Sequence, residues 1–306
     1  MTKEEIAKKT IEAIRANRSI KILESKNYLN SLYKDNEILE LSNRYGALKV
    51  ATAKSEVEGL NSSNLQKERD LIKKQFLEKI IEKGYDVNKL IPQFDCPLCN
   101  DRGILSNGEM CSCFNKLYYE NLLKETMCDL SRYPVLDRVN LDRYEDKQNK
   151  EKMIDTLKNL QTNDKNTILF SGATGTGKTY LAKCFLKTYI LKNNLGRIYS
   201  SSEINKIFVD AFKHYLNADQ ILFDVLDADI LIIDDLGAEA MYNNITKEYF
   251  LTILNERQGN NKITLFTTNL TLNDIKTRYN ERFFSRLMDN EISLKYNFQG
   301  KDLRLN

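Results

Sequence analysis

The fold of this chain is decided by one stretch, Ile168-Leu169-Phe170-Ser171-Gly172-Ala173-Thr174-Gly175-Thr176-Gly177-Lys178-Thr179. A short apolar run ends at a small polar residue and turns into a glycine-rich loop, and the residues from Tyr180 to Leu186 continue with helical periodicity. A Gly-x4-Gly-Lys-Thr pattern between a strand and a helix is the signature of a phosphate-binding loop. We therefore expect a nucleotide site here, in preference to a glycine turn that only joins a strand to a helix.

The residues of this loop have distinct expected tasks. Backbone N–H groups turn inward and the following helix N-terminus adds partial positive charge, and both features attract phosphate. Lys178 is expected to reach the β- and γ-phosphates, and the Thr179 hydroxyl is expected to coordinate Mg²⁺. The residues predicted to bind the nucleotide through the loop are Gly172, Ala173, Thr174, Gly175, Thr176, Gly177, Lys178 and Thr179.

A second stretch ends in two acids, Asp229-Ile230-Leu231-Ile232-Ile233-Asp234-Asp235. A buried strand of this kind delivers its carboxylates at the carboxyl edge of an open α/β sheet, where ligands bind. We expect Asp234 to hold Mg²⁺ and Asp235 to orient or deprotonate the attacking water, in preference to two acids that only face solvent. Many ATPases of this type carry Glu in place of Asp235, and a side chain shorter by one methylene predicts slow basal hydrolysis.

Polar residues further along the chain could complete this chemistry. Asn269 follows the strand Ile263–Thr267 and could contact the γ-phosphate and the attacking water, although turn chemistry also explains an asparagine there. Arg282 and Arg286 are four residues apart, so on a helix they share one face. Two arginines on one face beside an ATPase site suggest an arginine finger donated to a neighbouring subunit, which predicts a slow monomer.

Strands and helices alternate after the phosphate loop, which is typical of an open α/β sheet. The apolar runs are short and do not alternate with polar residues, so they fit parallel strands covered on both faces. The expected elements are helix Thr179–Lys192, strand Arg197–Ser200, helix Glu203–Leu216, strand Ile230–Ile233, helix Thr246–Gln258 and strand Ile263–Thr267. The predicted fold class is therefore α/β, with a P-loop ATPase domain built on a parallel sheet.

The first 93 residues have a different character. They contain few glycines, and their only proline is Pro92. Apolar residues recur at mixed threes and fours, which predicts amphipathic helices, and Asn61–Asn64 is a break with capping residues before a helix from Leu65 to Glu82. Such a helical region is either a small bundle with no task beyond its own core or an arm that docks a partner protein.

Four of the six cysteines lie within 18 residues, as the pairs Cys96/Cys99 and Cys111/Cys113. Zn²⁺ binds four thiolates in a tetrahedron, and paired cysteines from two turns supply that geometry. We predict a structural zinc site, because protein ligands fill all four positions and leave none open for catalysis. Four thiolates also suit an iron–sulfur cluster, and four free thiols near a turn are the third reading.

Composition limits the class of protein. The 306 residues leave room for two domains, and 42% hydrophobic with 29% charged residues is ordinary for a globular protein. The formal net charge of +3 is too small to identify a nucleic-acid binder. No apolar run approaches the ~20 residues that cross a bilayer, and the charged N-terminus lacks a signal-peptide core. We expect a cytoplasmic protein with no membrane partner.

With these motifs in place, the chain resembles bacterial replicative helicase loaders of the DnaC/DnaI type, which are AAA+ ATPases. The residues that carry the resemblance are Gly172–Thr179, Ile230–Asp235, Thr267-Thr268-Asn269, Glu281-Arg282-x-x-Ser285-Arg286-Leu287, Gly300–Leu305 and the four-cysteine block. The resemblance is specific from about residue 94 onward and is one of helical character before that. It implies three parts, namely a helical partner-docking domain (residues 1–93), a four-cysteine zinc module with a connecting helix (94–130) and an AAA+ ATPase domain (131–306).

The resemblance also implies ligands, partners and roles. It implies ATP with Mg²⁺, an N-terminal region that binds the hexameric replicative DNA helicase, contact with single-stranded DNA and self-association through the ATPase domain. In the site it implies Asn269 as the sensor, Arg286 as the finger and Arg282 as its neighbour. Twenty residues follow Arg286, so a large C-terminal lid is not expected.

The surface that contacts DNA is the least visible feature of the sequence. One helix mixes aromatic with basic residues, and these are Lys206, Phe208, Phe212, Lys213, His214 and Tyr215. Stacking combined with positive charge suits single-stranded DNA. The aromatic residues recur at threes and fours, however, and this spacing favours a core stripe.

The preferred function is an ATP-dependent loader that binds the hexameric helicase and helps deposit it on single-stranded DNA at replication initiation, with ATP binding and hydrolysis as the switch. A transposition-helper ATPase of the IstB type shares the core motifs and is the first alternative. A P-loop kinase that acts on a small molecule would instead have a substrate lid and would work as a monomer. A non-hydrolysing adaptor, in which ATP only braces the fold, is the remaining alternative.

Overall fold

The computed structural model describes residues 1–126, 128–160, 165–214, 218–242 and 245–305, and the side chains of residues 211–221 are outside that description. The chain divides into two compact units. One unit contains Met1–Lys8 and Lys116–Asn306, and the other contains Lys9–Asn115. The division predicted from the sequence at residues 93/94 and 130/131 stays a prediction.

The larger unit is built on a five-stranded sheet in the order β2-β3-β4-β1-β5, and every neighbouring pair is parallel. The strands are β1 (Thr167–Gly172), β2 (Gly196–Ser200), β3 (Ile230–Leu236), β4 (Ile263–Thr268) and β5 (Ser293–Phe298). Because all strands run the same way, their carboxyl ends meet at one edge of the sheet. The pairing of Ser171 with Thr268 and of Ser200 with Asp234 places the phosphate loop and the acid pair at that edge.

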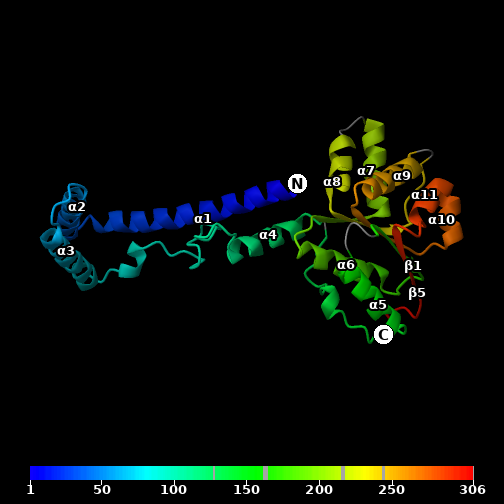
Figure 1. Cartoon of the computed structure of the whole chain (residues 1–306), viewed down its shortest axis with the longest axis horizontal. Coiled ribbons are helices and arrows are strands. Elements are labelled where there is room, and N and C mark those ends of the chain that lie inside the picture. The colour runs from blue at the N-terminus through cyan, green and yellow to red at the C-terminus, as the bar shows by residue number, and fades with distance from the viewer. Residues whose placement is uncertain (127, 161–164, 215–217, 243–244, 306) are drawn as a thin grey trace. The chain divides into compact units, whose positions relative to one another are not determined.

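Helices connect and cover these strands (Figure 1). Their bounds are η2 (Leu136–Arg138), α5 (Lys147–Lys158), α6 (Lys178–Ile190), α7 (Ser201–His214), α8 (Ala218–Asp227), α9 (Thr246–Gly259), α10 (Leu272–Tyr279) and α11 (Glu281–Leu287). Parallel strands need such crossovers, and their apolar faces bury the central strands completely. Ile230 to Ile233 are fully buried in β3, and Leu265 and Phe266 are fully buried in β4.

The parallel α/β architecture predicted from the sequence is confirmed. The expected strands and helices are present with ends that move by a few residues, whereas β5, α8 and α10 had not been predicted. After β5, the described residues 299–305 contain no helix, so the part of the chain in view has no helical lid at this end.

The smaller unit is helical, as predicted for the N-terminal region. It contains most of α1 (Lys3–Leu32), then α2 (Asn36–Val57), α3 (Ser63–Glu82), the short η1 (Val87–Leu90) and the start of α4 (Ser112–Lys124). Helices α2 and α3 pack against each other (Figure 1), and Leu32, Ile38 and Ile80 form a small buried cluster. Among the described residues, no helix is both long and apolar enough to cross a membrane.

Candidate functional site

The phosphate loop connects β1 to α6 and is shaped by glycines. Gly177 has a φ of 89° at the N-cap of α6, a conformation that side chains with a Cβ disfavour. A Cβ on Gly172 would lie 2.1 Å from the backbone oxygen of Phe298, so this position also requires glycine. On the opposite side of the loop, the N–H of Leu303 donates to the oxygen of Gly175 at 2.9 Å. The loop is therefore held in place by β5 and by the segment that follows it.

Lys178 lies across the inside of this loop. Its Nζ donates to the backbone oxygens of Gly172 (2.8 Å) and Ala173 (2.7 Å) and to Oδ1 of Asn269 (2.7 Å). Burial lowers the pKa of Lys178, and the negative charges of Asp235 and Asp234 oppose this effect only in part. A bound phosphate would add further negative charge beside this ammonium group.

The first acid of the pair is linked to the loop through hydroxyl groups. Oδ1 of Asp234 accepts hydrogen bonds from Oγ1 of Thr179 (2.8 Å) and from Oγ1 of Thr267 (2.6 Å). A hydroxyl and a carboxylate oxygen in contact are hard oxygen ligands of the kind that Mg²⁺ prefers. The sequence indicated Thr179 and Asp234 but missed Thr267, which looks like an ordinary residue of a buried strand.

The second acid has a strained backbone. Asp235 has a φ of 54°, and its N–H donates to Oγ1 of Thr267 at 2.9 Å. Nδ2 of Asn269 lies 3.4 Å from Oδ1 of Asp235, so the same amide contacts both Lys178 and Asp235. Partial burial, and then the charge of Asp234, raise the pKa of Asp235. A strained carboxylate with a raised pKa at the end of a strand is typical of a functional group.

These side chains surround one cavity of about 760 Å³, which is large enough for a nucleotide. Its lining from the predicted residues consists of Thr174, Gly175, Gly177, Lys178, Thr179, Asp234, Asp235 and Asn269. The rest of the lining consists of Tyr133, Asn140, Arg143, Tyr144, Tyr180, Leu303 and Arg304, to which the sequence had assigned no role. Thr176 is buried behind the loop, where its hydroxyl donates to the oxygen of Ala173 at 2.8 Å.

The two predicted arginines lie elsewhere. Arg282 and Arg286 are exposed on α11 and line a separate groove of about 490 Å³ together with Leu251 and Asn255 of α9. Neither residue lines the nucleotide cavity of its own chain. The structure therefore brings together every predicted catalytic and nucleotide-binding side chain around the loop except these two.

The raised pKa of Asp235 leads to a stability prediction. The proton is bound more tightly in the folded protein than the ordinary value of 3.8 allows, so the ionised form of Asp235 is a stability cost above the raised pKa. Asp235→Asn should raise the Tm of the ligand-free protein by roughly 1–3 °C at pH 7. The gain should shrink towards nothing as the pH falls through the raised pKa and below 3.8, where Asp235 becomes protonated in the unfolded state as well.

Thermal melts from about pH 3 to pH 8, which span the ordinary value of 3.8, measure this difference. Asp234→Asn is the matched control, and we expect no such gain from it because Asp234 already accepts two hydroxyl hydrogen bonds. A gain for Asp235→Asn that stayed constant across the pH range would show that the charge of Asp235 is not its cause.

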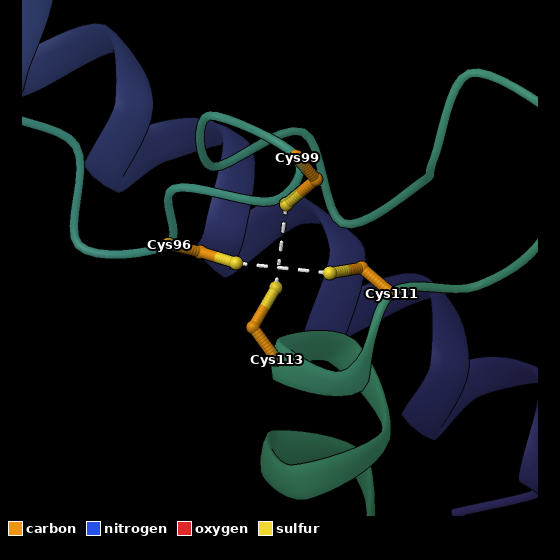
Figure 2. Close-up of side chains that lie close together, drawn as sticks. All are labelled: Cys96, Cys99, Cys111 and Cys113. Carbon is orange, nitrogen blue, oxygen red and sulfur yellow. Dashed lines mark hydrogen bonds between the residues drawn. The ribbon is translucent and has the colours of Figure 1, made fainter.

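The four paired cysteines converge in the smaller unit (Figure 2). Their sulfur atoms all lie within 4.8 Å of one another, with 3.7 Å between Cys96 and Cys111 and 3.4 Å between Cys99 and Cys113. Four sulfurs bound to one tetrahedral zinc lie about 3.8 Å apart, given bonds of about 2.3 Å. The cluster could therefore hold a metal ion, and its spacing fits a single tetrahedral ion.

Surrounding hydrogen bonds orient these thiols. The carboxylate of Asp101 accepts the N–H groups of Asp95 (3.0 Å) and Cys96 (2.8 Å), and the N–H of Gly103 donates to Sγ of Cys99 at 3.3 Å. A hydrogen bond from the backbone of Cys113 lowers the pKa of Cys111 to about 7. Burial raises the pKa of Cys113, so the surroundings favour the metal-binding thiolate form at Cys111 and disfavour it at Cys113.

One helix mixes aromatic and basic residues, and its spacing favoured a core stripe over a DNA-contacting surface. Phe208 is buried in the core of the larger unit and stacks on Tyr249, with ring centroids 4.4 Å apart. Its position fits the core stripe that the spacing favoured. The side chains of Phe212, Lys213, His214 and Tyr215 lie outside the described residues.

Comparisons with known proteins point to one group of ATP-binding proteins. The family model described as IstB-like ATP binding protein matches residues 123–290. A curated relative, the replicative helicase loader DnaC of Escherichia coli (strain K12), is 25% identical over 136 residues, which is 44% of this chain and 55% of that protein. The chain thus spans about half the length of the curated relatives it matches.

Two solved structures are similar to about half of this chain at low identity. The match to the structure of the DnaC helicase loader has a TM-score of 0.47 at 22% identity. It covers 54% of this chain and 96% of the DnaC chain. The match to the structure of DnaI has a TM-score of 0.46 at 21% identity. It covers 57% of this chain and 92% of the DnaI chain.

Proposed function

This chain belongs to the IstB-like ATP binding proteins, and on that basis we propose that it is an ATP-dependent loader of the hexameric replicative DNA helicase. The loader binds the helicase, helps deposit it on single-stranded DNA at replication initiation, and uses ATP binding and hydrolysis as its switch. The observation that carries the ATP part is the contact of Asn269 with both Lys178 and Asp235 inside one cavity. The helicase part is supported by the curated helicase-loader relatives.

The cavity suits hydrolysis of ATP to ADP and phosphate. The backbone N–H groups from Gly172 to Thr179 surround the phosphates, and Lys178 exchanges its carbonyl partners for phosphate oxygens. Thr179 and Asp234 hold Mg²⁺, which neutralises phosphate charge when bound. Asp235 takes a proton from the attacking water, and Asn269 holds that water against the γ-phosphate.

Hydrolysis by a lone protomer is slow in this proposal. Asp235 is one methylene shorter than glutamate, and a small misplacement of the base is costly in rate. Arg286, with Arg282 as its neighbour, lies outside its own cavity and is free to enter the cavity of an adjacent protomer. Self-association through the ATPase domain would then complete the site.

The N-terminal part would supply the helicase contact. We assign residues 1–93 to partner docking, residues 94–130 to a zinc module, and residues 131–306 to the ATPase domain. Zn²⁺ held by Cys96, Cys99, Cys111 and Cys113 is structural, because four thiolates leave no open coordination position. The ion would cross-link the turn that carries Cys96 and Cys99 to the turn that carries Cys111 and Cys113.

A second candidate is a helper ATPase for transposition, which the name of the matched family favours. Both functions use the same nucleotide chemistry, so the cavity cannot separate them. They differ in the protein that is bound, which is a helicase in one case and a transposase in the other.

The protein that this chain binds, a replicative helicase or a transposase, distinguishes the two candidate functions. The full chain should form a complex with the purified hexameric helicase of the same organism in size-exclusion chromatography. With ATP, it should increase helicase transfer to circular single-stranded DNA severalfold over helicase alone. Lys178→Ala should keep the complex but lose the ATP-dependent transfer, since the proposed docking region does not include the cavity. Failure to bind the helicase, with binding to a transposase, would establish the second candidate.

A further inference from the structure

The segment that carries Asp235 is an irregular part of the sheet. Between Ile233 and Leu236 the register of β3 against β4 shifts, so that Asp234 and Asp235 together oppose Thr267. One extra residue of this kind is a β-bulge, and bulges beside active sites re-aim a side chain. The φ of 54° at Asp235 is unfavourable for a residue with a Cβ, so the surrounding structure must hold this backbone in place.

Hydrogen bonds close the turn that follows Asp235. The backbone oxygen of Asp235 accepts the hydroxyl of Ser201 at 2.6 Å and the N–H of Ala238 at 3.0 Å. In the same turn, the N–H of Gly237 donates to Oε2 of Glu239 at 2.9 Å. Gly237 has a φ of 109°, a conformation that favours glycine. The carboxylate of Glu239 therefore fixes this turn from its far end.

Glu239 is a buried carboxylate with hydrogen-bond partners on both oxygens. Its side chain is 0% exposed, and its Oε1 accepts hydrogen bonds from Nε of Arg278 at 3.2 Å and from the hydroxyl of Tyr279. Arg278 also donates to the backbone oxygen of Glu239. A buried charge is costly unless it is paired and hydrogen-bonded, and these contacts meet that condition. The carboxylate thus joins the turn after Asp235 to the end of α10.

The end of α10 is anchored in the core of the larger unit. Tyr279 is 0% exposed, and its ring centroid lies 5.8 Å from that of Phe250 in α9 and 5.0 Å from that of Phe283 in α11. Helix α11, which carries Arg286, follows α10 directly. Glu239 therefore bonds through one oxygen to the turn of the proposed catalytic acid, and through the other to the base of the helix that carries the proposed finger.

We propose that Glu239 is a positioning residue for ATP hydrolysis, which holds the turn after Asp235 so that the Asp235 carboxylate stays in the nucleotide cavity. This role rests on the proposed ATPase activity and adds to it the support of the acid. Asp235 lines the cavity and Glu239 does not, so Glu239 acts through Asp235. A loosened turn should misplace the acid and leave the phosphate loop able to bind MgATP.

Glu239→Gln tests this role with little change in side-chain size. The N–H of Gly237, the Nε–H of Arg278 and the hydroxyl of Tyr279 need acceptors on both oxygens, and an amide offers only one. We expect kcat in assembled protomers to fall about 100-fold, the cost of a misplacement of about 1 Å. The Kd of MgATP, measured by isothermal titration calorimetry on the full chain, should stay within about three-fold of wild type.

Tyr279→Phe is a milder variant that removes only one donor to Glu239, and it decides the question if Glu239→Gln does not fold. Its kcat should fall severalfold with an unchanged Kd. Tyr189→Phe is the matched control, because Tyr189 is also buried in the larger unit and its hydroxyl donates to the oxygen of Leu157 at 2.7 Å. Both variants should lower the Tm, but Tyr189→Phe should leave kcat unchanged. All rates are measured well below the lowest Tm.

A double variant distinguishes positioning from a general structural role. If Glu239 acts through Asp235, then Asp235→Asn combined with Glu239→Gln should be no slower than Asp235→Asn alone. Losses that multiply in the double variant, an affinity for MgATP that falls as much as kcat, or equal slowing by Tyr189→Phe would overturn the role of Glu239. A wild type that binds MgATP but does not hydrolyse it in any assembly removes the proposed ATPase activity itself, and this role with it.

Discussion

Replacing Arg286 with alanine is expected to lower ATP turnover in assembled protomers by roughly 10³- to 10⁵-fold, the size of effect seen for arginine fingers. MgATP binding to each protomer should stay within a few-fold of wild type, because Arg286 does not line the cavity of its own chain. The backbone oxygen of Arg286 accepts the side-chain amide of Gln258 at 3.2 Å, and the alanine variant keeps this bond. Steady-state hydrolysis over a range of protein concentrations measures the effect.

Mixing of variants distinguishes donation to a neighbour from a local effect. Lys178→Ala has a defective nucleotide cavity but keeps Arg286. Arg286→Ala keeps an intact cavity but has no arginine to donate. Each variant alone should be nearly inactive, and an equimolar mixture should recover a substantial fraction of wild-type turnover. Arg282→Ala is the matched control, since Arg282 lies on the same exposed face. No recovery in the mixture, or a larger loss for Arg282→Ala, would contradict the role of Arg286.

Removal of the metal is expected to unfold the region around the four cysteines, while the larger unit, which contains the nucleotide cavity, stays folded. Structural zinc contributes on the order of 10–16 kcal/mol in zinc-finger peptides, which equals or exceeds the whole stability of most domains. Treatment with a strong chelator, or Cys99→Ser, should therefore open residues 94–115 to protease and reduce the helical circular dichroism signal. MgATP binding should change less than two-fold, because the cavity lies wholly within the other unit.

Metal analysis of the purified protein accompanies this test and should give one zinc per chain. Cys128→Ser is the matched control, since Cys128 is outside the cluster and should keep both the metal and the protease resistance. Iron in place of zinc would favour the cluster alternative. A Cys99→Ser protein with full metal content and an unchanged proteolysis pattern would show that these thiols are not ligands.

Much of the larger unit could be predicted because its signals are local. The phosphate loop, the apolar run before Asp234 and the helix after Lys178 are each specified by adjacent residues. The edge strand β5 had not been predicted, and its place in the sheet could not be. Its Ser293-Leu294-Lys295-Tyr296-Asn297-Phe298 sequence alternates polar and apolar residues, which is a local strand signal that had been overlooked, whereas its pairing with β1, more than a hundred residues earlier, has no local signal.

Within the site, too, residues that belong to local sequence patterns could be predicted, and residues that arrive through tertiary packing could not. Lys178, Thr179, Asp234 and Asp235 belong to patterns whose spacing reflects their chemistry. Thr267 reaches Asp234 only because β3 and β4 are neighbours, and Tyr133 reaches the cavity only because the segment before the sheet folds back towards α6. Such contacts depend on tertiary packing, and no periodicity in the sequence encodes them.

The support of the phosphate loop by β5 and Leu303 has a consequence for how the protein is made. The loop leaves the ribosome before its supports, because Phe298 and Leu303, which hold Gly172 and Gly175, follow more than a hundred residues later. At ordinary rates of synthesis that delay is on the order of ten seconds. A nascent chain therefore carries an unsupported loop during that interval, and we expect it to bind a nucleotide only after β5 has emerged.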